Sequence, residues 1–431
     1  MRCYWSLFRV SKRWLTASLS SGGAQIARML AGLVLLKLIV VQLGPTGVGR
    51  LGHFMNLLSV LIVFGGGGIL TGVVKYVAEY RENPERLREF LSAASAYSLL
   101  FSGGLLVGLV AFAQDISRAL FGATELAGPI IGLALAQAIF GFINFVTGLV
   151  NGLLKSGTYA RITIVGTLMG LAPAYPLVSH FGIVGAVYAL IALQAGLAIP
   201  AAFVLREQRA VIRSPRLNRA DAWRIGRFSI IQMFSVATMP LAEIYIRNVL
   251  SQTVGWDGAG MWQGVQRLSY AYLSLFITFL SVYYMPTLSG VTNRHQMFAL
   301  VRKTAAGVAL PFLVMAAIYF FGRTWIFSLL LTSKFLISSQ DLLFQLTGDF
   351  FRILAYTLTF VAVARAATLL CVLCELAQSA IYLGFFTWIS SNSVGGNIFK
   401  AYAASYLSYF LLCLGGILIY SRIPRVQQAQ S

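Results

Sequence analysis

The stretch "MLAGLVLLKLIVVQLGPTGVG", residues 29–49, decides the fold, because it joins a long apolar run to a glycine-rich turn. The apolar run begins near residue 18 and ends at 43, which supplies the roughly 20 residues that cross a bilayer as a helix. A glycine loop that binds phosphate requires a preceding strand and a following soluble helix, and this stretch has neither. The stretch therefore predicts a membrane helix that ends in a tight turn.

The rest of the chain repeats this apolar pattern. Of its 431 residues, 58% are hydrophobic and only 11% are charged, which is more apolar than a soluble domain could bury. The runs are continuous rather than alternating, so they exclude the strands of a membrane barrel. We predict an all-α polytopic membrane protein with about twelve transmembrane helices, near 18–43, 52–75, 91–113, 127–153, 160–179, 182–205, 225–250, 259–288, 304–322, 341–364, 366–390 and 397–421.

The basic residues between the runs predict the orientation. Most of them fall on the side of the N-terminus, and the opposite side holds only Arg50, Arg118, Arg247, Arg323, Lys334 and Lys400. Basic loops mark the cytoplasmic side of a membrane protein, so both termini are expected in the cytoplasm. The net charge of +20 then reflects topology and anionic lipid, and no nucleic-acid partner is expected.

The glycine-rich turn occurs twice. "GPTGVG" at 44–49 and "GWDGAG" at 255–260 lie 211 residues apart, and Asn83 and Asn293 in the next loops lie 210 apart. The spacing predicts two six-helix lobes, related by a pseudo-two-fold axis along the membrane normal, with a cleft between them as in transporters. The glycines expected to form turns or hinges are Gly44, Gly47, Gly49, Gly255, Gly258 and Gly260.

Five segments follow from this division. They are a basic amphipathic N-terminus at 1–17, an N-lobe at 18–205, a basic cytoplasmic linker at 206–224, a C-lobe at 225–421 and a cytoplasmic tail at 422–431. A further glycine run, "FGGGG" at 64–68, interrupts the second apolar run and is expected to allow a bend or close helix packing.

The residue types of common active sites are not gathered in this chain. Cys371 and Cys374 form a C-x-x-C pattern, but they lie in an apolar run without further ligands, and the three histidines are scattered. We expect no metal site, no disulfide framework, no built-in ATPase and no enzyme activity.

Charged residues inside the apolar runs are the candidate site residues, because each costs about 2.5 to 3.5 kcal/mol to insert. Arg28 and Lys37 lie nine residues apart, so they point to opposite faces of the first helix, and Arg28 is the deeper. Arg28, Arg267 and Arg352 are expected to converge on the cleft and to bind a diphosphate or an acidic sugar. Lys37 is a further candidate for this binding.

The acidic residues fall mainly in loops of the first lobe, whereas the second lobe has Glu243, Asp349 and Glu375 in or near its helices. The spacing allows two local ion pairs, Glu243 with Arg247 and Asp349 with Arg352. The alternative is that Asp349 or Glu375 titrates during a cycle coupled to a proton or cation gradient. No other cofactor is expected.

Several motifs resemble the Wzx-type lipid-linked oligosaccharide flippases, including those of enterobacterial common antigen, in the multidrug/oligosaccharidyl-lipid/polysaccharide exporter superfamily. The similarity runs from about residue 17 to 420 and is carried by "LGPTGVG", "GVVKYVAEY" with "NPERLR", "LFGATE", "WQGVQRLSYAYL", "SVYYMPTLS", "SKF", "QLTGD" and "LCELAQ", in the same order. The basic N-terminus and the arginines of the linker depart from that pattern.

The resemblance implies a flippase in the bacterial inner membrane. Its substrate would be an undecaprenyl-diphosphate-linked oligosaccharide, moved to the periplasmic leaflet for assembly of enterobacterial common antigen or O-antigen. Membrane lipids, a polysaccharide polymerase and a chain-length regulator would be its partners. The alternatives are a cation-coupled multidrug exporter of the same superfamily, which the lack of a membrane carboxylate in the first lobe disfavours, and a membrane enzyme of glycan assembly.

Overall fold

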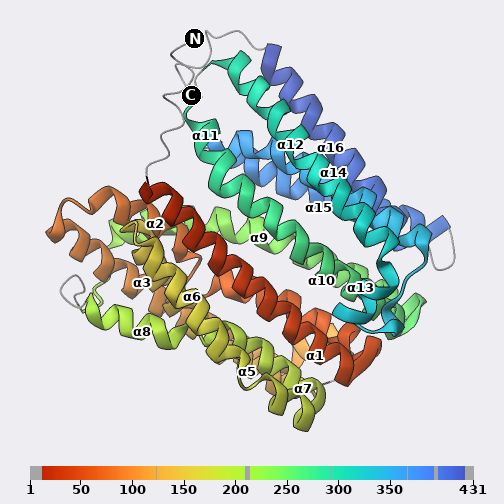
Figure 1. The fold of residues 1–431 in the computed structure, drawn as a ribbon. Coiled ribbons are helices and arrows are strands. Elements are labelled where there is room, and N and C mark those ends of the chain that lie inside the picture. The colour runs from red at the N-terminus through yellow and green to blue at the C-terminus, as the bar shows by residue number, and fades with distance from the viewer. Residues whose placement is uncertain are drawn as a thin grey trace. The chain divides into compact units, whose positions relative to one another are not determined.

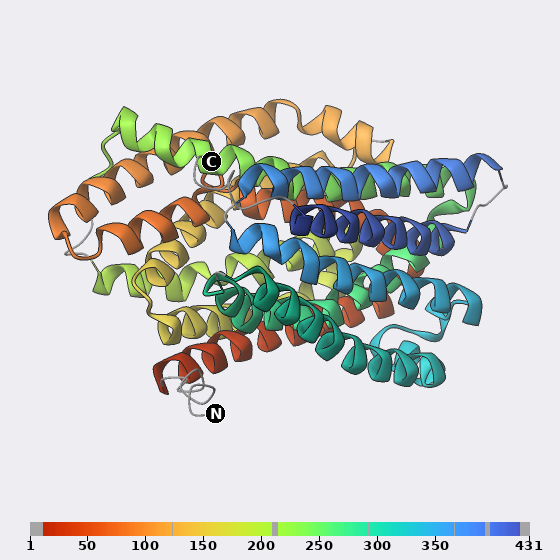
Figure 2. The same ribbon diagram turned by 90° about the horizontal axis from the view of Figure 1, so that it is seen from above.

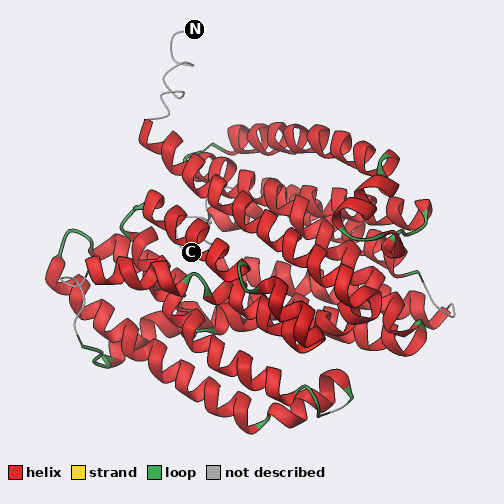
Figure 3. Cartoon of the chain, turned by 60° about the horizontal axis from the view of Figure 1, so that its bottom comes forward, coloured by secondary structure: helices red, strands yellow, loops and turns green. Residues whose placement is uncertain are grey.

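The fold is taken from a computed structural model that describes residues 12–122, 124–208, 214–291, 293–365, 367–392 and 397–422. Within these ranges every regular element is a helix and no strand occurs (Figure 3). Most of the predicted basic N-terminus and cytoplasmic tail, and residues 209–213 of the predicted linker, lie outside the described residues. The chain forms two compact units, Met1–Pro240 and Leu241–Ser431, and the predicted lobes at 18–205 and 225–421 stay a prediction.

The first unit is built around α5 (Figure 1). This helix contacts α1, α2, α3 and α7, and its apolar window is 67% buried, the highest value of any candidate span in the described residues. The elements of the unit are α1 (Lys12–Phe64), α2 (Ile69–Tyr80), α3 (Pro84–Ala111), α4 (Ala113–Phe121), α5 (Ala127–Gly152), α6 (Ser156–Leu171), α7 (Ala174–Ala195), α8 (Ala198–Glu207) and the first part of α9 (Arg219–Thr253).

The second unit is built around α14, which contacts α10, α11, α12, α15 and α16 (Figures 1 and 2). Its apolar window is 56% buried, against 22% for α12 and for α15. After the end of α9 the elements are α10 (Gly255–Phe279), the π-helix η3 (Leu280–Tyr284), α11 (Met285–Ser289), α12 (Arg294–Phe321), α13 (Arg323–Leu330), the 3-10 helix η4 (Ser333–Phe335), α14 (Ser339–Ala364), α15 (Thr368–Asn392) and α16 (Ile398–Arg422).

The helices identify a polytopic membrane protein. Among the described residues, ten segments are long and apolar enough to cross a bilayer. One of them, Gly22–Tyr80, has 59 residues and covers most of the first predicted span and all of the second. The boundary expected between the fifth and sixth spans falls at Gly182, where α7 bends with a φ of 54°. The prediction of an all-α protein with many spans is therefore confirmed.

The two glycine-rich stretches are more helical than expected. Only their first glycines leave the helix, with a φ of 62° at Gly44 and 75° at Gly255, and both stretches then continue as helix. A Cβ atom at Gly47 would lie 2.4 Å from Leu43 Cβ, and one at Gly258 would lie 2.6 Å from Val254 Cγ2. Gly49 and Gly260 are buried within helices. The expected six-residue turns are thus breaks at a single residue, the first glycine of each stretch. The fourth residue of each stretch has to be small.

The loops that follow are also alike. Asn83 caps α3 by accepting a hydrogen bond from the backbone nitrogen of Arg86, and Asn293 caps α12 by accepting one from His295. An asparagine at this position satisfies a backbone donor that a helix would leave open at its start. The spacing of 210 residues seen in the sequence therefore corresponds to the same local structure in each unit.

Candidate functional site

The glycine run at 64–68 separates α1 from α2, and side chains of α3 and α5 hold the break open. Gly66, Gly67 and Gly68 have positive φ values, which only glycine adopts readily. Asn144 donates to the carbonyl oxygens of Ile62, at 2.7 Å, and Gly65, at 3.1 Å. Ser102 Oγ accepts from the Gly66 nitrogen at 3.1 Å. Backbone groups that cannot reach water thus have partners at the break, as an apolar medium requires.

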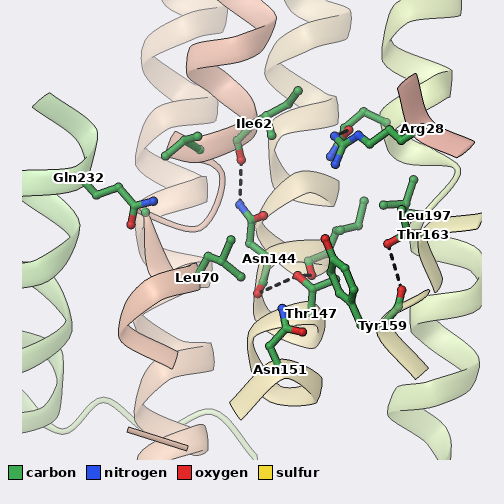
Figure 4. Close-up of a pocket in the computed structure, with 14 residues that line it drawn as sticks. Arg28, Ile62, Leu70, Asn144, Thr147, Asn151, Tyr159, Thr163, Leu197 and Gln232 are labelled. Carbon is green, nitrogen blue, oxygen red and sulfur yellow. Dashed lines mark hydrogen bonds between the residues drawn. The ribbon is translucent and has the colours of Figure 1, made fainter. Parts of the chain in front are cut away.

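A cavity of about 150 Å³ lies beside this break in the first unit (Figure 4). Each water molecule in such a cavity needs roughly 10 to 15 Å³, so the space accommodates a polar group larger than a single water. Helices α1, α2, α5, α6, α7 and α9 contribute to its lining. The lining polar side chains are Arg28, Asn144, Thr147, Asn151, Tyr159, Thr163, Gln194 and Gln232.

Arg28 provides the positive charge of this cavity. Its Nη2 donates to Oε1 of Gln194 on α7, and it makes no other hydrogen bond to the described residues. Among the described residues that line the cavity, none is a carboxylate. The combination of one guanidinium with amides and hydroxyls suits an anionic or hydroxyl-rich ligand, since an organic cation would meet no opposite charge.

The two basic residues of the first predicted helix have different surroundings in the first unit. Lys37 is half-buried on α1 and is absent from the cavity lining, whereas Arg28 faces the cavity. Gln194, Tyr159 and Gln232 were not among the sequence candidates. Gln194 is an amide within an apolar run, a signal that the sequence shows, but nothing in the sequence indicates that α7 brings it to Arg28.

The second unit contains a buried polar network centred on Asp349, which is 0% exposed. Its carboxylate accepts hydrogen bonds from Ser269 Oγ at 2.7 Å, from Tyr402 OH at 2.6 Å and from Tyr272 OH. Gln345 Nε2 is also near, at 3.3 Å. Donors from α10, α14 and α16 thus surround the charge, and such contacts offset the desolvation of a buried carboxylate.

Arg352 lies one turn after Asp349 and is enclosed by tyrosines. Its Nε donates to Tyr356 OH at 3.1 Å and its Nη1 to Tyr402 OH at 3.2 Å. The guanidinium carbon lies 4.8 Å from the ring centroid of Tyr270 and 5.1 Å from that of Tyr406. Aromatic faces attract a cation, and this attraction increases where water is excluded.

The two local ion pairs expected from the sequence do not form. Among the described residues, neither Asp349 with Arg352 nor Glu243 with Arg247 has a nitrogen and an oxygen within 4.0 Å. Tyr402 bonds both Arg352 and Asp349. Glu243 instead accepts from Tyr270, and Arg247 donates to Gln263. Sequence spacing indicates which residues share a helix face, but it does not show that side chains from other helices provide their hydrogen-bond partners.

Two other arginines of this unit have polar atoms that lack partners. Arg247 is 0% exposed, bonds Gln263 through Nη2, and has no hydrogen-bond partner for Nε and Nη1 among the described residues. Arg267 on α10 is half-buried, and its Nε is likewise unpartnered there. Glu375 on α15 is exposed. The unit therefore brings Glu243, Asp349 and Arg352 into one network and leaves Glu375 outside it.

One strong ion pair of the first unit was not anticipated. Arg86 on α3 donates to both carboxylate oxygens of Asp221, the Nη1 contact being 3.0 Å, and Asp221 is fully buried at the start of α9. Arg224 lies 3.7 Å from the same carboxylate. A bidentate pair of this kind fixes geometry as well as charge, so the start of α9 is anchored on α3.

The fold is similar to that of several solved structures. An inward-facing multidrug resistance MATE family transporter of the MOP superfamily has a TM-score of 0.78 at 14% identity, covering 96% of this chain and 99% of that chain. A MOP superfamily transporter from Pyrococcus furiosus gives 0.63, also at 14% identity, with 94% and 96% covered. Identities this low establish the shared fold and nothing further.

The family follows from the sequence comparisons. The model of the polysaccharide biosynthesis protein family matches residues 15–291, and the chain belongs to this family. The lipid III flippases of Escherichia coli (strain K12) and of Shigella flexneri are each 33% identical over 410 residues, covering 94% of this chain and 98% of the relative.

Proposed function

We propose that this chain is a flippase that moves a lipid-linked oligosaccharide across the bacterial inner membrane by alternating access. The observation that carries the proposal is the 33% identity to lipid III flippases, which extends over nearly the full length of both chains. The substrate is an undecaprenyl-diphosphate-linked repeat unit, taken from the cytoplasmic leaflet to the periplasmic leaflet for enterobacterial common antigen or O-antigen. The protein itself makes and breaks no covalent bond.

The chemistry of the first-unit cavity supports an anionic substrate. Arg28 faces the cavity, and among the described residues the Gln194 amide is its hydrogen-bond partner, so its remaining donors are available to phosphate oxygens. Asn151, Tyr159 and Gln232 supply donors and acceptors for sugar hydroxyls. A multidrug exporter for organic cations would be better served by a carboxylate at this position.

In the second unit, Arg267 is proposed as the main phosphate ligand, because its Nε lacks a partner among the described residues. Arg352 is 6% exposed and is held by tyrosines, so its proposed contact with the substrate requires a conformation in which Tyr270 and Tyr402 have moved away from it. Lys37 contributes long-range attraction rather than a contact in the cavity. Convergence of Arg28, Arg267 and Arg352 on one substrate remains part of the proposal.

Coupling to a proton or cation gradient is assigned to an acidic residue of the second unit. Asp349 accepts several hydrogen bonds from neighbouring side chains, so we assign it a structural role in this network. Glu375 is exposed, and an acid on a membrane helix needs a reason. We therefore assign coupling to Glu375. We also propose, from the basic-residue pattern, that both termini lie in the cytoplasm. A polysaccharide polymerase and a chain-length regulator are the proposed protein partners.

The test is deletion of the gene, followed by mass spectrometry of the lipid-linked intermediates. The proposal requires that complete undecaprenyl-diphosphate-linked repeat units accumulate and that the wild-type gene clears them. If no such lipid accumulates, and the strain instead becomes sensitive to organic cations, the multidrug alternative replaces this proposal.

A further inference from the structure

An apolar groove lies in the second unit, where α14 ends, α15 begins and α16 ends. These three helices pack side by side (Figures 1 and 2). The groove has a volume of about 230 Å³ and is lined mainly by aliphatic side chains, among them Leu358, Ala362, Leu370, Leu412 and Ile417. It is separate from the Asp349 network, whose residues do not contribute to its lining.

The groove is open to the surroundings of the protein. Leu370 and Leu412 line it and are 51% and 52% exposed. Gly416 also lines it, and a Cβ atom built there would meet no other atom within 4 Å. Because α15 and α16 are apolar helices of spanning length, with only 22% and 28% of their apolar windows buried, we take the surrounding medium to be membrane lipid.

A cationic group lies at the mouth of the groove. Arg365 directly follows the last residue of α14, lines the groove and is exposed. Its Nη2 donates to the carbonyl oxygen of Val291 at 2.8 Å, which leaves Nε and Nη1 without hydrogen-bond partners among the described residues. The charge pattern of the chain assigns this end to the cytoplasmic side, where basic pockets between helices bind anionic lipid head groups.

We propose that this groove binds an anionic phospholipid of the cytoplasmic leaflet, with one acyl chain between α14, α15 and α16 and the phosphate on Arg365. The exposed aliphatic walls match the chain, and the guanidinium at the helix end matches the head group. A protein partner does not fit a groove open to lipid. Arg352 precedes Arg365 by 13 residues, which is about 20 Å along a helix, so this site is distinct from the arginines proposed to bind the diphosphate.

Native mass spectrometry of the purified full-length protein tests the proposal with phosphatidylglycerol as the probe. Gly416→Leu should fill the groove and abolish one bound lipid, whereas Gly415→Leu, at a neighbouring position that is also open but does not line the groove, should leave it. Arg365→Gln should lower the affinity for that lipid about tenfold, because a charge-assisted contact to its phosphate is lost. Equal lipid binding by the Gly416 and Gly415 variants would show that the lipid does not bind in this groove.

Two native cysteines give a second readout. Cys374 lines the groove and Cys371, one turn earlier on α15, does not, although both are half-buried. Added phosphatidylglycerol should slow maleimide labelling of Cys374 several-fold relative to Cys371. Equal slowing at both positions contradicts the groove as the site. Preferential displacement of phosphatidylglycerol by undecaprenyl phosphate would overturn the phospholipid assignment while leaving the flippase proposal intact.

Discussion

A guanidinium group in an apolar interior requires acceptors, and Arg28 and Arg352 meet this requirement in different ways. Arg28 bonds a single amide and faces a cavity, whereas Arg352 is surrounded by tyrosine rings and hydroxyls. The first arrangement leaves donors for a ligand, and the second uses them within the protein. At the scale of single residues, we therefore expect Arg28 to affect transport and the Arg352 network to affect stability.

Replacement of Arg28 tests the first expectation. Arg28→Ala should reduce glycan export about ten- to a hundredfold at matched protein level, since contacts to charged groups contribute about 1.5 to 3 kcal/mol each. Arg28→Lys should restore part of the export, because the charge returns without the bidentate fork. Lys37→Ala, on the same helix but outside the cavity lining, should reduce export much less, because a charge that makes no contact in the cavity contributes only long-range attraction. Similar export by the Arg28 and Lys37 alanine variants would contradict the role of the cavity.

Replacement of Asp349 tests the second expectation. Asp349→Asn keeps the shape but exchanges an acceptor for a donor that faces tyrosine hydroxyls, so the free energy of unfolding should fall by about 2 to 3 kcal/mol. Glu375→Gln should leave it nearly unchanged, because this side chain is exposed and makes no hydrogen bond to the described residues. Thermal unfolding in detergent measures both. An Asp349 variant as stable as the wild type would show that the network is not structural.

Glu375→Gln also tests coupling. If Glu375 exchanges the proton, its amide variant should transport at a rate that no longer changes when the proton gradient across a vesicle is collapsed. The wild type should slow under the same treatment. A variant that responds to the gradient as the wild type does would remove Glu375 from the coupling mechanism.

At the scale of elements, the most buried helix of each unit carries its polar site. Helix α5 holds Asn144 and Thr147, and α14 holds Asp349 and Arg352. These helices correspond to the fourth and tenth predicted spans, six spans apart along the chain. The two helices thus occupy the same place in the order of each half. Two similar halves, each with one polar central helix, would have this order.

The contact between α5 and the α1–α2 break provides a test at this scale. A Cβ atom on Gly141 would lie 2.6 Å from the backbone nitrogen of Gly66, a contact that real structures avoid. Gly141→Ala should therefore destabilise the protein by about 1 to 3 kcal/mol, as overpacking does. Gly103→Ala on α3, where nothing lies within 4 Å, should have little effect. Equal unfolding temperatures for these two variants would contradict the described packing.

The sequence predicted the helices well because an apolar run of spanning length has few alternatives in a membrane. It located the breaks at Gly44, Gly182 and Gly255 to within a few residues. It could not predict the pairing of Arg28 with Gln194, since 166 residues separate them and their approach depends on how α1 packs on α7. For the same reason the tyrosines around Arg352, which come from α10, α14 and α16, were not expected.

At the scale of the whole molecule, the orientation rests on the basic residues. In a variant without native cysteines, Leu217→Cys should react only with a reagent that enters the cytoplasm, and Val254→Cys should react with an impermeant reagent from outside. Both positions are exposed, at 54% and 44%. Labelling of position 217 from outside would reverse the topology, and with it the proposed direction of transport.

The central claim is that this chain moves lipid-linked oligosaccharide, and reconstitution tests it most directly. The purified protein is placed in vesicles that carry a polyprenyl-diphosphate-linked oligosaccharide, and the fraction of glycan accessible to an external glycosidase is followed over time. The account predicts that the wild type exposes glycan from the inner leaflet and that Arg28→Ala does so at least tenfold more slowly. Accessibility no faster than in protein-free vesicles, from protein that is folded and correctly inserted, would contradict it.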